Sequence, residues 1–187
     1  DADLMVILIR FRALPDNQMQ FIDDYLKSGK PILGMRTATH AFNFDECSFK
    51  SSYEHYGNYY LFKTVWQGGF GRLILGEKWI AHHGAHGQQS TLGIVAETSK
   101  NHPIFNGIIP GTIWGATDVY AIRLPMSDTV IPLLFGQVTE RNGPYDKKDL
   151  FFGMRPSDSE PAGMVKRINK QGDTISIDLN APMMPVA

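Results

Sequence analysis

Three of the chain's six histidines fall within five positions, at His82, His83 and His86. Neutral imidazole is a common metal ligand, and it is also the side chain that exchanges protons near neutral pH. The spacing matches no established zinc motif, and it lacks the glutamate of a His-Glu-x-x-His motif. We therefore expect at least one of these histidines to transfer a proton or to bind substrate. The alternatives are a metal ion held by the three histidines, with His40 or His102 as a further ligand, and a structural role.

A second group of polar side chains follows two apolar segments of the chain. Arg10 and Arg12 come after residues 4–9, and residues 36–40 come after residues 31–35. In open parallel sheets, ligands bind outside the carboxyl ends of the strands. Guanidinium groups offer paired donors for carboxylates, phosphates and hydroxyls. The pattern predicts a crevice that binds a polar small molecule through Arg10, Arg12, Arg36, Thr37 and Thr39, with His40 as a catalytic candidate. The alternative is that the arginines pair with Asp23, Asp45 or Glu46.

The elements that must position these residues begin with a strand over residues 4–9. This run is apolar throughout, which predicts a strand buried on both faces. Pro15 suits the first turn of a helix, Met19 and Ile22 recur at helical spacing, and Gly29 supplies the stop. Residues 31–35 predict a second strand, so that strand, helix and strand form a βαβ unit with a parallel pair.

The remaining chain predicts further short elements. Residues 43–67 are rich in aromatic side chains without clear periodicity, which indicates a surface excursion that either lines a cleft or is anchored to the body by its rings. A short helix is expected near residues 70–75, a turn or short helix over 102–108 and a loop over 139–162. Strands are expected near residues 91–96, 118–122, 130–138 and 174–178.

The amino-acid composition limits the classes of protein to which this chain can belong. The 187 residues are 43% hydrophobic and carry 18 basic and 19 acidic side chains, so we expect a globular chain without a nucleic-acid partner. No apolar run is long enough to cross a bilayer, so no membrane partner is expected. Cys47 is the only cysteine and stands beside acidic residues, which disfavours a nucleophilic thiolate. We expect a single domain over residues 1–187.

Several segments resemble one known family. Residues 29–42 (GKPILGMRTATHAF) resemble the ThuA-like (trehalose-utilisation) family of the class I glutamine-amidotransferase-like superfamily. The resemblance continues at residues 81–84 (AHHG), 102–108 (HPIFNGI), 118–120 (DVY) and 182–187 (PMMPVA). It implies a flavodoxin-like, doubly wound α/β fold with a mostly parallel sheet and helices on both faces. It also implies that the family's first βα unit and last strand are absent here, so that the chain is truncated at both ends.

The resemblance further implies a role in bacterial carbohydrate catabolism. The matching motif positions hold His40, His82 and His83, which become the catalytic candidates, and Trp114 is a further candidate for substrate binding. True amidotransferases carry a nucleophilic cysteine where this chain has Arg36, and a guanidinium cannot attack a carbonyl, so glutamine amidotransfer is excluded.

Three functions remain open from the sequence. The first is an enzyme, a hydrolase or lyase, that binds and transforms a sugar or keto-sugar derivative without a cofactor. The second is a non-catalytic module that binds a sugar or an anion. The third is a metal-dependent hydrolase that uses the cluster His82, His83 and His86. The expected partner is a small carbohydrate, with a homo-oligomer as a further option, and the location is either the bacterial cytoplasm or the periplasm.

Overall fold

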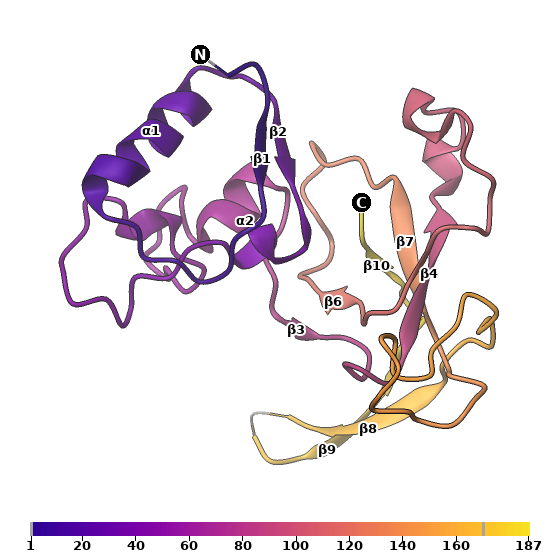
Figure 1. Cartoon of the computed structure of the whole chain (residues 1–187). Helices are drawn as coiled ribbons and strands as arrows, with labels where there is room; N and C mark the ends of the chain where they lie inside the picture. Colours follow the sequence, from indigo (N-terminus) through magenta and orange to yellow (C-terminus); the bar gives the residue numbers. More distant parts are fainter. Residues whose placement is uncertain (1, 170) are drawn as a thin grey trace. The chain divides into compact units, whose positions relative to one another are not determined.

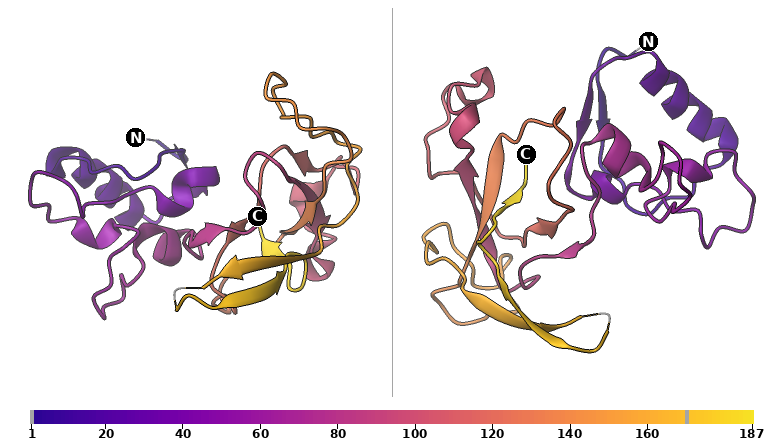
Figure 2. Two further views of the ribbon diagram at one scale, coloured as in Figure 1. Left: turned by 90° about the horizontal axis from the view of Figure 1, so that it is seen from below. Right: turned by 180° about the vertical axis from the view of Figure 1, so that it is seen from behind.

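The computed structural model describes residues 2–169 and 171–187, which divide into two compact units. Unit 1 comprises the chain up to Trp79 together with Arg123–Val130, and unit 2 comprises Ile80–Ile122 and Ile131–Ala187. Figures 1 and 2 show the elements of each unit. One cluster of buried hydrophobic residues lies within unit 1 and another within unit 2, so each unit is described by itself.

Unit 1 contains the predicted βαβ unit. Strand β1 (Met5–Ile7) pairs in parallel with β2 (Ile32–Gly34), and α1 (Asp16–Lys27) connects them. The helix begins directly after Pro15, and Gly29 follows it with a φ of 69°, a conformation that a residue without Cβ adopts freely. These predictions are therefore confirmed.

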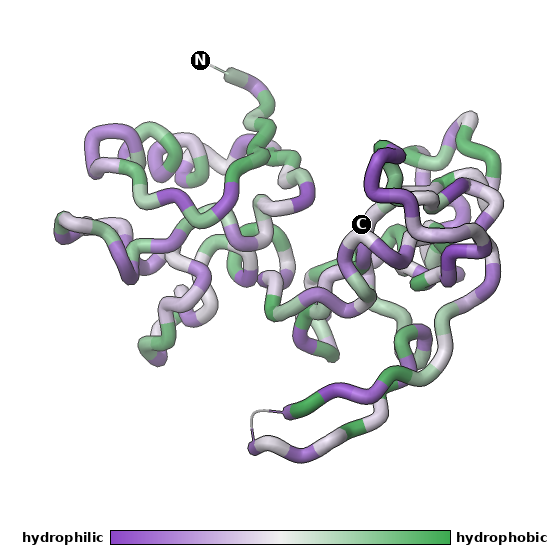
Figure 3. Tube along the Cα trace, turned by 60° about the horizontal axis from the view of Figure 1, so that its bottom comes forward, coloured by the Kyte–Doolittle hydropathy of each residue, from purple (hydrophilic) through white to green (hydrophobic). Residues whose placement is uncertain are grey.

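The prediction that the first strand is buried on both faces is wrong. Ile7 is 6% exposed, whereas Val6 is 54% exposed and Leu33 on the paired strand is 51% exposed. Figure 3 shows the hydrophobic colouring of this N-terminal segment. Successive side chains of a strand point to opposite faces of the sheet, so alternate apolar residues stay exposed where nothing in unit 1 packs against the second face.

The aromatic excursion anchors itself to the core of unit 1. Phe44 and Tyr56 are buried, and Trp66 packs against the same cluster, with its ring 4.5 Å from that of Tyr56. By contrast, Phe62 is 69% exposed. The expected short helix is α2 (Gly69–Ile74), and two 3-10 helices complete the unit, η1 (Arg36–His40) and η2 (Glu54–Tyr56). The anchoring interpretation is confirmed for these buried rings.

Unit 2 is built from antiparallel strands. Its four-stranded sheet has the order β10-β7-β4-β5, and two further pairs are β3-β6 and β8-β9, the hairpin at the bottom of Figure 1. The bounds are β3 (Ala81–His82), β4 (Ser90–Val95), β5 (Trp114–Gly115), β6 (Tyr120–Ala121), β7 (Leu134–Thr139), β8 (Met164–Ile168), β9 (Thr174–Asp178) and β10 (Met184–Pro185). Two 3-10 helices, η3 (Glu97–Ser99) and η4 (Pro103–Phe105), follow β4.

The expected flavodoxin-like fold is wrong. Within the described residues the strand pairs of unit 2 are all antiparallel, the parallel strand pair is β1-β2 alone, and both α-helices belong to unit 1. A doubly wound sheet needs a helical crossover after nearly every strand. The connections after β4 instead consist of turns, loops and short 3-10 helices in the described residues, and no α-helix covers the sheet of unit 2. None of the helices formed by the described residues is long and apolar enough to span a membrane.

We expect Tyr56→Phe to destabilise the chain by about 1–2 kcal/mol. The buried Tyr56 hydroxyl donates a hydrogen bond of 2.7 Å to Asp23, whose carboxyl group is also buried. Removal of the donor leaves Asp23 with one bond fewer in a desolvated position. Urea unfolding measures the loss, with the exposed Tyr59→Phe as the matched control. Equal effects of the two substitutions would contradict this account.

The stability of the chain should fall when His55 is protonated. Burial lowers the pKa of this imidazole below its ordinary value of 6.5, and the ring packs 4.7 Å from both Tyr56 and Trp66. The free energy of unfolding that depends on neutral His55 is fully present above pH 6.5. It is lost as the pH falls through the lower pKa of His55 in the folded chain. An NMR titration measures the pKa of His55, and urea unfolding above pH 6.5 and below that pKa measures the loss of stability. His55→Phe should remove the dependence and His102→Gln should keep it; a His55 pKa of 6.5 or above would refute it.

Candidate functional site

Two histidines converge on one buried carboxylate in unit 2. His82 Nδ1 lies 2.6 Å from Asp118 Oδ2, and His86 Nδ1 lies 2.6 Å from Asp118 Oδ1. A carboxylate has no hydrogen to donate, so each imidazole N–H is the donor. The two rings lie 5.2 Å apart between centroids, and both are exposed, whereas the Asp118 side chain is fully covered.

The β3-β6 ladder brings His82 and Asp118 together although 36 residues separate them in the chain. His82 is the partner of Tyr120, and the amide of His83 continues the ladder by donating to the Val119 carbonyl at 2.8 Å. Gly84 then allows close approach, since a Cβ there would lie 3.1 Å from Val138 and 3.6 Å from the Cβ of Asp118. The following turn returns His86 to the same carboxylate.

His83 has different surroundings from its neighbour His82. It is 5% exposed, and its Nε2 donates to the Leu179 carbonyl at 2.9 Å. Burial lowers the pKa of His83, which keeps its ring neutral. Arg167 on β8 donates to the carbonyls of both His82 and His83 and so fixes the backbone of the histidine segment. The catalytic role expected for His83 stays a prediction, and its contacts suit an anchor.

The charge of Asp118 is the electrostatic feature of this cluster. Asp118 pairs with His82 and His86, and no lysine or arginine pairs with it in the described part of the chain. A buried carboxylate is costly unless hydrogen bonds or a cation compensate it. One ligand atom from each of the three residues lies within 4.8 Å of the others, a donor set of two nitrogens and one oxygen. Zinc and non-haem iron are held by such sets.

The strand ends of unit 1 do lie together, as expected. The amides of Phe11 and Arg12 donate to the carbonyls of His40 and Ala41 at 2.9 and 2.8 Å. Phe11 and Arg36 have φ values of 46° and 44°, in the left-handed region that side chains rarely adopt. Arg10, Arg12 and Arg36 are exposed, and Thr37 and Thr39 are half-buried. Arg10 and Arg12 form no ion pair with a described residue, so the alternative of pairing with Asp23, Asp45 or Glu46 does not hold for them.

His40 lies within an aromatic cluster rather than at an open surface. It is 4% exposed, with ring centroids 4.8 Å from Phe11 and 5.0 Å from Trp79. His40 and Arg36 belong to unit 1 and His82 to unit 2, so their expected sharing of one crevice stays a prediction. Trp114 on β5 packs edge-on against Phe151 at 5.7 Å.

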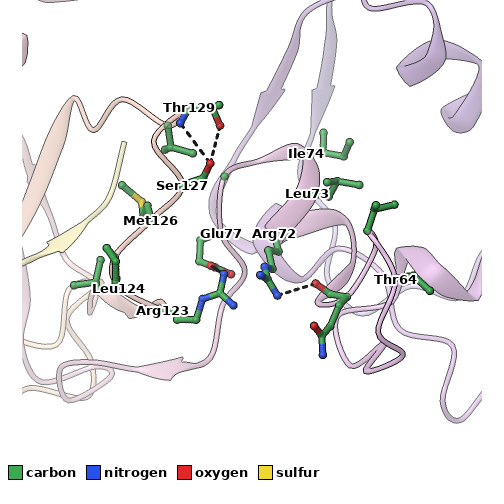
Figure 4. Close-up of a pocket in the computed structure, with 15 residues that line it drawn as sticks. Thr64, Arg72, Leu73, Ile74, Glu77, Arg123, Leu124, Met126, Ser127 and Thr129 are labelled. Atoms are coloured by element: carbon green, nitrogen blue, oxygen red, sulfur yellow. Dashed lines mark hydrogen bonds and ion pairs between the residues drawn. The ribbon is translucent and has the colours of Figure 1, made fainter.

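Unit 1 also contains a cavity of about 750 Å³ that the sequence did not indicate. Figure 4 shows Arg72, Glu77 and Arg123 among its lining residues. Glu77 accepts hydrogen bonds from Arg123 at 2.9 Å and from the Lys78 amide at 2.9 Å, and Arg72 donates to the Gln67 carbonyl. Glu77 and Arg123 neutralise each other, Arg72 bonds to a neutral carbonyl, and none of the described groups of possible metal ligands lines this cavity, so it offers less chemistry than the histidine cluster.

Comparison with protein-family models, curated proteins and solved structures finds no match to this chain. The resemblance to ThuA-like proteins is thus neither supported nor refuted. Function is therefore inferred from the geometry of the His82, His86 and Asp118 cluster.

Two important site residues, Asp118 and Arg167, were not singled out from the sequence. In the sequence, Asp118 stood only as the first residue of a predicted strand and of the DVY segment, with no role assigned to it. Its closeness to His82 depends on the pairing of two-residue strands, which no local pattern reveals.

We expect Arg167→Met to destabilise unit 2 by about 1–2 kcal/mol and to raise hydrogen exchange over residues 82–86. The substitution removes the donors to the carbonyls of His82 and His83. Lys166→Met, at the adjacent and exposed position on β8, is the matched control. The anchoring role would be disproved by unchanged exchange at residues 82–86 in the Arg167 variant.

Proposed function

We propose that this chain is a metal-dependent hydrolase or lyase domain whose centre is His82, His86 and Asp118, and that its substrate is a carbohydrate derivative. The observation that carries the proposal is the meeting of two exposed imidazoles on one fully covered carboxylate that no lysine or arginine of the described chain neutralises. A divalent cation would balance that charge, and three protein ligands leave room for water or substrate. The carbohydrate part is supported by the ThuA-like segments alone.

The chain's own residues have separate tasks in this proposal. A divalent ion held there supplies a Lewis acid that polarises a bound oxygen. Asp118 holds both rings at hydrogen-bond distance, and Arg167 fixes the backbone that carries His82. The buried His83 ties the same segment to Leu179, so the two exposed rings keep their places when solvent or substrate enters. Preorganisation of this kind is what a catalytic centre requires of its scaffold.

A second candidate is a metal-free acid–base enzyme. The 2.6 Å bonds from Asp118 hold each imidazole in the tautomer with the proton on Nδ1, which leaves Nε2 as the basic nitrogen. In this version His82 or His86 moves the proton and Asp118 orients the ring. The specific observation in its favour is that the hydrogen bonds from His82 and His86 to Asp118 form without a metal ion.

Calorimetric titration of the chelator-treated full chain with Zn²⁺ and Mn²⁺ separates these candidates. We expect one ion per chain, and Asp118→Asn should weaken binding by about 10–100-fold or more, because ligand and orienting groups both act on that scale. The exposed Asp128→Asn is the matched control and should bind as the unmodified chain does.

Turnover gives the second measurement. Disaccharides and 3-keto-sugars are incubated with the metal-loaded and chelator-treated chain, and products are separated by chromatography. Turnover only with metal, lost in His86→Gln, supports the first candidate; turnover without metal, also lost in His86→Gln, supports the second. Absence of both stoichiometric metal and turnover overturns the enzyme and leaves a binding module.

A further inference from the structure

A cavity of about 430 Å³ adjoins the histidine cluster within unit 2. Its lining comes from two segments, the histidine turn with His86, Gly87 and Gln88, and the loop after β7 with Arg141, Tyr145 and Phe152. We propose that this cavity is the substrate subsite and that it binds a sugar ring bearing a carboxylate or a phosphate. The assignment of the cavity to a substrate rests on the function proposed above, because His86 belongs to both the cavity and the candidate centre.

Arg141 supplies the charge that selects an anion. Its Nε donates to the Gly143 carbonyl at 3.1 Å, and its Nη1 donates to the Gln88 carbonyl at 3.3 Å. Both acceptors are neutral, and no carboxylate pairs with Arg141 in the part of the chain that the structure describes. The guanidinium is therefore oriented while its charge stays available, which is the state that binds a carboxylate or a phosphate.

Two aromatic rings supply an apolar surface beside that charge. Tyr145 and Phe152 are parallel within 1°, with centroids 5.9 Å apart, and Tyr145 is 52% exposed. The Arg141 guanidinium lies 5.3 Å from the Tyr145 centroid. Rings and a cation in one wall suit a molecule with an apolar ring face and an anionic substituent.

The loop holds Phe152 in a strained conformation. Its φ is 54°, in the left-handed region that is unusual for a bulky side chain. Asp149 imposes this conformation, since its Oδ2 accepts from the amides of Phe151 and Gly153 at 2.9 Å each, and Arg155 pairs with the same carboxylate. The hydrogen bond from Arg155 lowers the pKa of Asp149 to about 2. Strain of this kind persists where the surroundings impose it, and it is often found at ligand sites.

The other wall favours a sugar over a flat aromatic anion. Gly87 has a φ of 71°, and a Cβ there would lie 3.8 Å from the Phe152 ring, so the absence of a side chain leaves this part of the cavity open. The His86 imidazole and the Gln88 amide of this wall, with the Tyr145 hydroxyl of the first wall, are polar groups that match sugar hydroxyls. An aromatic acid has no hydroxyls that could bond to these groups, so it forgoes the hydrogen bonds that a sugar gains.

The test is calorimetry on the full chain with four probes, D-glucuronate, D-glucose 6-phosphate, D-glucose and benzoate. We expect at least one of the two acidic sugars to bind, at least about tenfold more tightly than D-glucose and benzoate. Whichever acidic sugar binds more tightly identifies the anion as carboxylate or phosphate. Equal binding of D-glucose, tighter binding of benzoate, or no binding of either acidic sugar would overturn the proposal.

Arg141→Gln should weaken the acidic sugar about tenfold or more while leaving D-glucose unchanged, because only the anion loses its partner. Lys147→Gln, an equal loss of charge at an exposed position of the same loop, is the matched control and should bind as the unmodified chain does. Tyr145→Leu provides a second variant without a charge change and should weaken all sugars. Circular dichroism verifies that each variant is folded; equal losses from Arg141→Gln and Lys147→Gln would refute the role of Arg141.

The outcome can be separated from that of the metal proposal. Zn²⁺ binding should be unchanged in Arg141→Gln, and the unsubstituted metal-free chain should keep its preference for the acidic sugar over D-glucose. If the chain binds the acidic sugar but no metal ion, the proposed metal centre is refuted and the proposed subsite is supported. If the chain binds a metal ion but shows no preference for an acidic sugar, the proposed metal centre is supported and the proposed subsite is refuted.

Discussion

The burial of one carboxylate, that of Asp118, is the constraint on which the site in unit 2 depends. Its side chain is fully covered, and its partners are the imidazoles of His82 and His86 at 2.6 Å each. Because water cannot reach this charge, the two rings cannot leave it without a large electrostatic cost. The same constraint explains why the ladder at His82, the close approach at Gly84 and the anchor from Arg167 all converge on one short segment.

Local patterns were sufficient for the elements of the fold whose signals are local. The helix over Asp16–Lys27, its stop at Gly29 and the strand Ser90–Val95 follow from side-chain periodicity and backbone freedom, which act within a few residues. The architecture was not predictable in this way. A continuous apolar run over residues 4–9 is compatible with burial on one face or on two, and the choice depends on what packs against the sheet. Val6 and Leu33 remain exposed, whereas Ile7 on the opposite face belongs to the buried core of unit 1.

The candidate site shows the same limit. The histidines stood out from the sequence because three of them fall within five positions, but their partner Asp118 is 36 residues from His82. Arg141 and Arg167 carry no local signal of their roles, since each acts through backbone carbonyls on distant segments. Residue types therefore predict which chemistry is available, while long-range pairing decides which side chains meet.

The adjacent pair His82 and His83 illustrates how strand geometry assigns these roles. Successive side chains of an extended strand point to opposite sides, so two neighbouring histidines cannot both reach the same carboxylate. His82 meets Asp118 and stays exposed, whereas His83 is buried against the Leu179 carbonyl. The second imidazole at Asp118 must come from a residue beyond a turn, and the segment that begins at Gly84 returns the chain so that His86 reaches the same carboxylate. The spacing of the three histidines is thus explained by one strand and one turn, with two rings placed for chemistry and one placed for support.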